Sequence, residues 1–170
     1  MKREGYVVVP RFIGTEDAHA AAASVLAAKS AWTPAFGGVQ FSLGLAWYTH
    51  LEEGKSRDYF ANAEASRARV EACVPGLVAR LEAGVGRILG GPLVRRRGFA
   101  GPGIHVFPAE GACSRDGGDV HFDVEGLTPA ERAAFTPAFT FVLMLQPAEH
   151  GGGLRIWDRT FEGGETDEGA

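Results

Sequence analysis

The stretch Asp119-Val-His-Phe-Asp-Val-Glu125 lies among short apolar segments that predict the sheet part of this fold. Apolar and polar residues alternate in it, which is typical of a β-strand with one buried face. Side chains two positions apart on a strand project from the same face, so His121 and Asp123 are expected to face the same way. An imidazole and a carboxylate in this arrangement can hold a single cation.

The His-x-Asp spacing is a weak signal when it is taken alone. With five histidines and seven aspartates among 170 residues, roughly 0.2 such pairs arise by chance at this composition. Two histidines and one carboxylate form the facial triad of non-haem Fe(II) sites, so this pair would be two-thirds of such a set. Further support for a metal site has to come from the sequence on either side of the pair.

Short strands separated by turn residues are predicted on both sides of the pair. They cover residues 93–99, 103–108, 120–124, 138–146 and 153–158. Between two of them, Thr128-Pro-Ala-Glu131 is a capping-box pattern with proline at the first helical position. This pattern predicts a short helix within the strand-rich part of the chain.

The first ninety residues are predicted to be mainly helical. A strand over residues 6–12 leads into an alanine-rich helix over 16–30, which Thr15 can cap. Two further helices are expected after Arg57 and after Gly76, separated by Pro75-Gly76 and ended by Gly90-Gly91. Residues 31–56 carry aromatics and glycines without a helical period, which indicates a loop or irregular strands beside a pocket.

This order predicts an α+β fold, with helices on one face of a largely antiparallel, barrel-like sheet. We expect a single domain over residues 1–160, with a helical part over 1–91 and a sheet part over 92–160. The acidic, glycine-rich residues 161–170 are expected to form a flexible tail.

Composition excludes several classes of function. Hydrophobic residues make up 45% of the chain and charged residues 22%, as in ordinary globular proteins. A net charge of −4 gives no electrostatic reason to expect a nucleic-acid partner. No apolar run is long enough to span a membrane or to act as a signal peptide, so we expect a cytoplasmic protein. Two cysteines without close spacing indicate neither a disulfide framework nor a structural zinc site.

Four motifs follow one another between residues 103 and 159. They are Ile104-His-Val-Phe-Pro-Ala-Glu-Gly111, Val120-His-Phe-Asp123, Phe139-Thr-Phe-Val-Leu-Met-Leu-Gln146 and Gly151-Gly-Gly-Leu-Arg-Ile-Trp157. In this order they resemble the first core strand with its turn, the His-x-Asp and the next two strands of the double-stranded β-helix (jelly-roll, cupin-like) of Fe(II)/2-oxoglutarate-dependent oxygenases, especially the prolyl 4-hydroxylase-like branch. The resemblance covers the front half of that β-helix.

The resemblance implies that His121, Asp123 and a later histidine hold Fe(II), with 2-oxoglutarate as cosubstrate and dioxygen as oxidant. The expected activity is hydroxylation of an unactivated C–H bond in a small-molecule or peptidyl substrate. Halogenating relatives replace the carboxylate with a small residue, so Asp123 favours hydroxylation.

The family's distal histidine, and the arginine or lysine that follows it, have no counterpart in these 170 residues. We therefore expect a truncated form that lacks the last core strands. The alternatives are a site completed in another way, such as across a homodimer, an inactive oxygenase-like binding module, or a cupin-like metalloenzyme that does not use 2-oxoglutarate. His150 lies in a turn where the family places no ligand.

Three further residues are candidates for binding the cosubstrate. His105 shares a strand face with Phe107, at a position where related oxygenases often have a pocket-lining tyrosine. Phe107 lacks the hydroxyl that such a tyrosine would offer, and His105 could instead be a packed strand histidine. The guanidinium of Arg155 could bind a carboxylate in a bidentate fork, although Leu154 and Ile156 are expected to be the inward-facing pair.

Overall fold

A computed structural model describes residues 5–124, 126–134 and 138–157 of the chain. These residues belong to two units, a central unit of residues 20–118 and a terminal unit that joins residues 1–19 to residues 119–170. A single domain with a division near residue 91 stays a prediction, and the expected tail over residues 161–170 lies outside the described residues.

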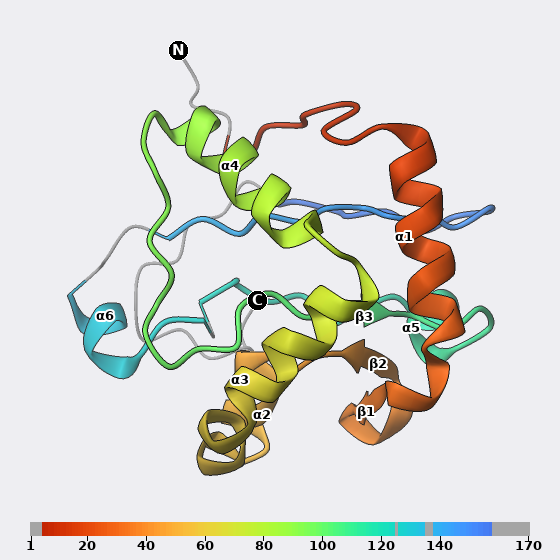
Figure 1. Cartoon of the computed structure of the whole chain (residues 1–170). Helices are drawn as coiled ribbons and strands as arrows, with labels where there is room; N and C mark the ends of the chain where they lie inside the picture. The colour runs from red at the N-terminus through yellow and green to blue at the C-terminus, as the bar shows by residue number, and fades with distance from the viewer. Residues whose placement is uncertain (1–4, 125, 135–137, 158–170) are drawn as a thin grey trace. The chain divides into compact units, whose positions relative to one another are not determined.

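The sheet of the central unit has three antiparallel strands in the order β1-β2-β3 (Figure 1). They are β1 (Thr33–Ala35), β2 (Gln40–Leu43) and β3 (Ile104–Val106). A short 3-10 turn, η2 (Phe36–Gly38), connects β1 to β2, and the φ of +67° at Gly37 explains why glycine stands there. The strand predicted over 103–108 is confirmed by β3, whose pairing partner lies more than sixty residues earlier in the chain.

Four helices account for most of the remaining central unit. The alanine-rich helix is confirmed as α1 (Thr15–Ala27), which begins in the terminal unit at Thr15 itself and is followed by the 3-10 turn η1 (Lys29–Ala31). The two later helices are confirmed as α3 (Ser56–Cys73) and α4 (Leu77–Leu89). Left-handed glycines, Gly76 and Gly90, flank α4 as the breaks in the sequence pattern predicted.

Helix α2 (Trp47–Glu52) lies within residues 31–56, which were expected to form a loop or irregular strands, and it packs beside α3 (Figure 1). Its six residues are too few to show a helical period, so tertiary packing has to stabilise it. Trp47 contributes to a cluster of aromatic rings with Tyr59 and Phe99, at centroid distances between 5.1 and 5.9 Å. The hydroxyl oxygen of buried Tyr59 accepts a hydrogen bond of 3.0 Å from the Ala100 amide. This core fixes the segment before β3 against α3.

Two short helices complete the regular elements of the described chain. Helix α5 (Ala112–Asp116) follows β3 in the central unit, and α6 (Pro129–Ala133) belongs to the terminal unit. The capping box predicted for α6 is confirmed, because Thr128 Oγ1 accepts from the Glu131 amide and the Glu131 carboxylate accepts from the Thr128 amide.

The other predicted strands are not observed as strands. Within the described residues, the segments over 6–12, 93–99, 120–124, 138–146 and 153–157 form no paired ladder. Strand-like sequence makes an extended backbone favourable, but a strand also needs a neighbour that satisfies its N–H and C=O groups. The double-stranded β-helix therefore stays a prediction.

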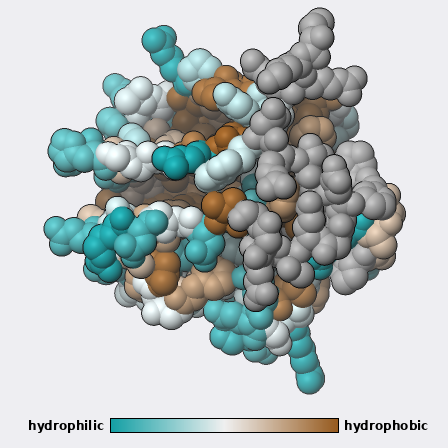
Figure 2. Space-filling model, turned by 180° about the vertical axis from the view of Figure 1, so that it is seen from behind, coloured by the Kyte–Doolittle hydropathy of each residue, from teal (hydrophilic) through white to brown (hydrophobic). Residues whose placement is uncertain are grey.

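The extended segments of the terminal unit also leave apolar side chains exposed. The expectation that Leu154 and Ile156 face inward is wrong, because both are exposed, as is Phe139. Hydrophobic residues accordingly reach the surface between hydrophilic ones (Figure 2). One ring pair in this unit does pack, with the centroids of Phe12 and Phe141 at 5.2 Å.

Candidate functional site

The structure brings His121 and Asp123 together in the terminal unit. Their Nε2 and Oδ1 atoms lie 3.4 Å apart, and about half of each side chain is exposed, at 52% and 56%. A β-strand was expected to place these two side chains on one face, but no strand forms over these described residues. Instead, the Val124 amide donates a 2.7 Å hydrogen bond to the Phe122 carbonyl, which closes a tight turn around Asp123.

A second contact orients the imidazole of this pair. His121 Nδ1 lies 2.8 Å from the backbone carbonyl oxygen of Asp119. A carbonyl oxygen can only accept, so Nδ1 carries the proton and donates it. When the ring is neutral, its lone pair is at Nε2, the nitrogen that faces Asp123. Metal-binding histidines typically donate their second nitrogen to a carbonyl or carboxylate in this way, which fixes the tautomer.

The donor set fits a cation that prefers mixed nitrogen and oxygen ligands. Metal bonds to histidine nitrogen and carboxylate oxygen are about 2.1 Å long, so two such ligands at a right angle stand about 3.0 Å apart. The observed separation of 3.4 Å is close to that value. His121 and Asp123 can therefore serve as two ligands of one ion without a large rearrangement.

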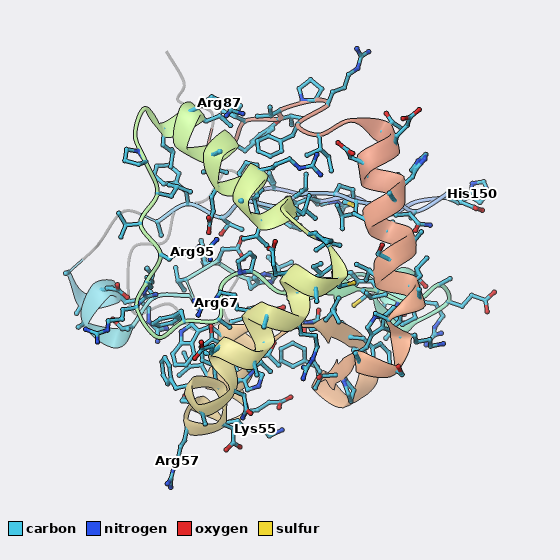
Figure 3. All side chains as sticks on the ribbon, in the orientation of Figure 1. Lys55, Arg57, Arg67, Arg87, Arg95 and His150 are labelled. Atoms are coloured by element: carbon cyan, nitrogen blue, oxygen red, sulfur yellow. The ribbon has the colours of Figure 1, made fainter. Side chains whose placement is uncertain are left out.

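The described residues bring no third ligand to this pair. Among them, no three His, Cys, Asp or Glu side chains gather closely enough to hold an ion. His150 is exposed at the turn between the extended segments 138–146 and 153–157 (Figure 3). Arg155 is also exposed, and its guanidinium carbon lies 6.0 Å from the centroid of the Trp157 ring.

His105 lies in the central unit, on β3, directly opposite Ser42 of β2. Its Nδ1 is 2.9 Å from Ser42 Oγ, and its ring centroid is 5.6 Å from that of Tyr48. Burial lowers the pKa of the His105 imidazole below its ordinary value, so the ring is neutral at pH 7. Gln40 Nε2 donates a 2.9 Å hydrogen bond to the phenol oxygen of Tyr48.

These contacts make His105 part of a cluster of polar side chains that the sequence did not lead us to expect. Gln40 and Ser42 alternate with Phe41 and Leu43, and this period of two was the signal that could have identified a polar strand face. Phe107 follows the end of β3 and is exposed. His121, Asp123 and Arg155 belong to the terminal unit.

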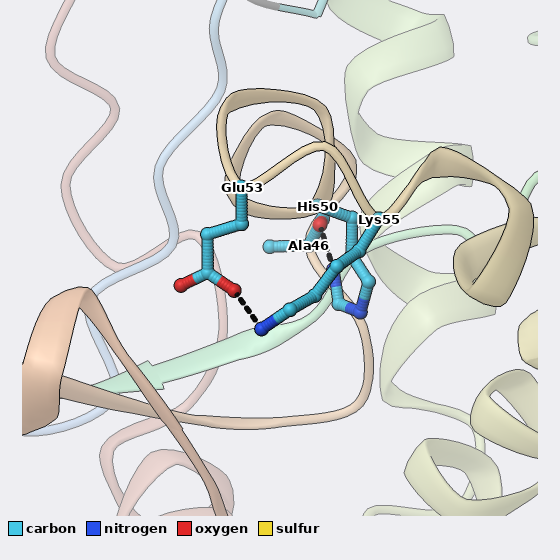
Figure 4. Close-up of polar contacts among 4 residues, drawn as sticks. All are labelled: Ala46, His50, Glu53 and Lys55. Atoms are coloured by element: carbon cyan, nitrogen blue, oxygen red, sulfur yellow. Dashed lines mark hydrogen bonds and ion pairs between the residues drawn. The ribbon is translucent and has the colours of Figure 1, made fainter.

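Other polar contacts of the central unit hold local structure. His50 Nδ1 donates to the Ala46 carbonyl at 2.8 Å, and Lys55 Nζ lies 2.6 Å from the Glu53 carboxylate (Figure 4). The lysine lowers the pKa of Glu53. These are contacts within one helix and the turn that follows it.

A small hollow lies beside α3 and α4, with Arg67 and Arg95 among its lining residues (Figure 3). Its volume of about 20 Å³ suits a single water molecule. Arg95 is held by two hydrogen bonds, of 2.6 and 2.8 Å, to the Glu82 carboxylate. This hollow is too small for an organic ligand.

Comparison with known proteins finds no matching family model, no matching curated protein and no matching solved structure. None of the described helices has the length and apolar character needed to cross a membrane. Function is therefore inferred from the two groups of side chains described above and from the sequence motifs.

Proposed function

We propose that this chain carries the His-x-Asp part of an Fe(II)- and 2-oxoglutarate-dependent dioxygenase that hydroxylates an unactivated C–H bond. The observation that supports the proposal is the His121–Asp123 pair, with Nε2 and Oδ1 3.4 Å apart and Nδ1 donating to the Asp119 carbonyl. The sequence order around the pair, from residue 103 to residue 159, supports the same assignment.

Each residue of the pair has a separate role in this proposal. The Asp119 carbonyl holds the proton on Nδ1, so Nε2 of His121 offers a lone pair. Asp123 supplies a negative charge that favours binding of a cation, and its half-exposed position leaves room for cosubstrate and substrate. When bound, Fe(II) with 2-oxoglutarate and dioxygen supplies the oxidising power for C–H hydroxylation.

The first test is anaerobic equilibrium dialysis of the full chain against Fe(II), with and without 2-oxoglutarate. We expect binding of one Fe(II) per chain, and we expect His121→Ala to weaken it at least about tenfold because one of two ligands is lost. His150→Ala is the matched control, since it removes an exposed histidine outside the pair. Equal Fe(II) affinity in His121→Ala and the parent chain would contradict the assignment of the metal site.

The second test measures succinate formed from 2-oxoglutarate after oxygen is admitted. The proposal predicts iron-dependent succinate formation that both His121→Ala and Asp123→Ala abolish. If Fe(II) binds at the pair but no succinate forms with any added substrate or without one, the metal site stands and the dioxygenase assignment fails.

A further inference from the structure

The terminal unit contains an uncharged segment whose backbone is open to pairing. Residues 138–144 read Ala-Phe-Thr-Phe-Val-Leu-Met, without a charge, a proline or a glycine. Among the described residues, none exchanges a backbone hydrogen bond with this segment. Aromatic and β-branched side chains favour a strand conformation, and a row of unpaired N–H and C=O groups is a template for another strand. The segment can therefore accept a strand from outside the chain.

Apolar side chains around this backbone are open to solvent. Six of them, on the two extended segments of the terminal unit, are 48–81% exposed: Phe139, Val142, Met144, Leu154, Ile156 and Trp157. Their average exposure is about 60%. At about 150–200 Å² for each whole side chain, they present roughly 550–750 Å² of apolar surface. A stable complex buries about 800 Å² on each partner, so the area available is close to what a dimer needs.

A second copy of the same segment is the partner that these features favour. Two identical strands that pair in antiparallel orientation are related by a twofold axis, the commonest symmetry of homo-oligomers. No like charges face each other in such a pair, because residues 138–144 carry none. The other extended segment is a poorer strand, since it contains Arg155 and follows three glycines at 151–153.

We propose that two copies of this chain pair their 138–144 segments as antiparallel strands and so form a homodimer. The chain bends at residues 145–146, so the pairing spans seven residues and places Phe141 on the twofold axis. In this register, Thr140 of one copy faces Val142 of the other on one side of the ribbon. The dimer is independent of the proposed iron site.

The first experiment is sedimentation velocity of the full chain over a range of concentrations. We expect a saturating shift from the mass of one chain to that of two. Val142→Lys should raise the dissociation constant of the dimer at least about tenfold, because two lysines then come near each other across the pair. Val94→Lys is the matched control, since Val94 is 89% exposed in the central unit and its replacement should leave the constant unchanged.

Disulfide cross-linking tests the register of the two strands. Thr140→Cys and Val142→Cys are made separately in chains whose free cysteines, Cys73 and Cys113, are replaced by serine, and one of the two carries ¹⁵N. Facing residues have Cα atoms about 4.5–5.5 Å apart, within reach of a disulfide, whereas diagonal residues at about 7–8 Å are not. Oxidation of the mixture should therefore give the mixed dimer, identified by its mass, in preference to either self-linked dimer.

Three sedimentation results would overturn the proposal. They are a chain that stays monomeric at every concentration, association that continues past two copies, and equal dissociation constants for Val142→Lys and Val94→Lys. If Val142→Lys loses the circular dichroism of the parent chain, the cross-linking experiment decides. A mixed disulfide that forms no faster than the self-linked ones contradicts the pairing of residues 138–144.

Discussion

Substitution of Gly44 by alanine should destabilise the central unit more than a loss of backbone freedom explains. Gly44 has a φ of +85°, and a Cβ placed there would stand 2.6 Å from Val70 Cγ2 and 3.3 Å from Ser66 Oγ. Both neighbours are buried on α3, and Ser66 Oγ also accepts a 2.8 Å hydrogen bond from the Leu45 amide. Neither side chain can move away without disturbing the packing of α3 against the segment that follows β2.

The magnitude follows from two terms. A left-handed backbone disfavours an L-residue by about 1–2 kcal/mol. Forcing an extra methyl into a packed core typically adds about 1–3 kcal/mol. Gly44→Ala should therefore lower the free energy of unfolding by about 2–5 kcal/mol, a large part of the roughly 5–15 kcal/mol that is typical of a globular protein.

The assay is urea unfolding followed by far-ultraviolet circular dichroism. Gly37→Ala is the matched control, because Gly37 also has a positive φ, of +67°, but a Cβ placed there would meet no atom within 4 Å. The control should lose only about 1–2 kcal/mol. In the double variant with Val70→Ala, the clash is relieved, so the combined loss should be smaller than the sum of the two single losses by at least about 0.5 kcal/mol. Equal losses for Gly44→Ala and Gly37→Ala would refute the close approach of Gly44 to α3.

Three further outcomes are expected. Tyr59→Phe leaves the buried Ala100 amide without its acceptor and should cost about 1–3 kcal/mol in urea unfolding, with no loss if the amide finds water. Burial lowers the pKa of His105 in the folded chain, so below a pH of about 6.5 the unfolded chain binds more protons than the folded chain. The free energy of unfolding should therefore fall as the pH drops from about 7 towards about 5, and it should fall less in His105→Gln. Thr128→Ala removes the capping box and should destabilise α6 by about 1 kcal/mol, measured as faster exchange of the Glu131 amide proton; unchanged exchange would count against the cap.

Local sequence signals predicted the long helices and the breaks that end α3 and α4, whereas α1 ends at Ala27, three residues before its expected end. The break at Pro75-Gly76 and the stop at Gly90 depend on residues whose backbone preferences act within one turn, so neighbours far away in the chain do not alter them. The capping box at Thr128 is local for the same reason. Helix α2 was missed because its six residues are too few to show a helical period, and packing against α3 stabilises it.

The sequence alone determined that His121 and Asp123 would be close, because two residues separated by one other cannot be far apart in any tight turn or strand. Only the tertiary structure decided that Ser42 would meet His105, since the antiparallel register of β2 and β3 joins residues 63 positions apart. The partner of a polar residue on a short strand depends on how the whole sheet pairs, which the residue's own neighbours in sequence do not specify. The extended segments of the terminal unit show the same limit, because their composition favours an extended backbone while strand pairing requires a neighbouring strand.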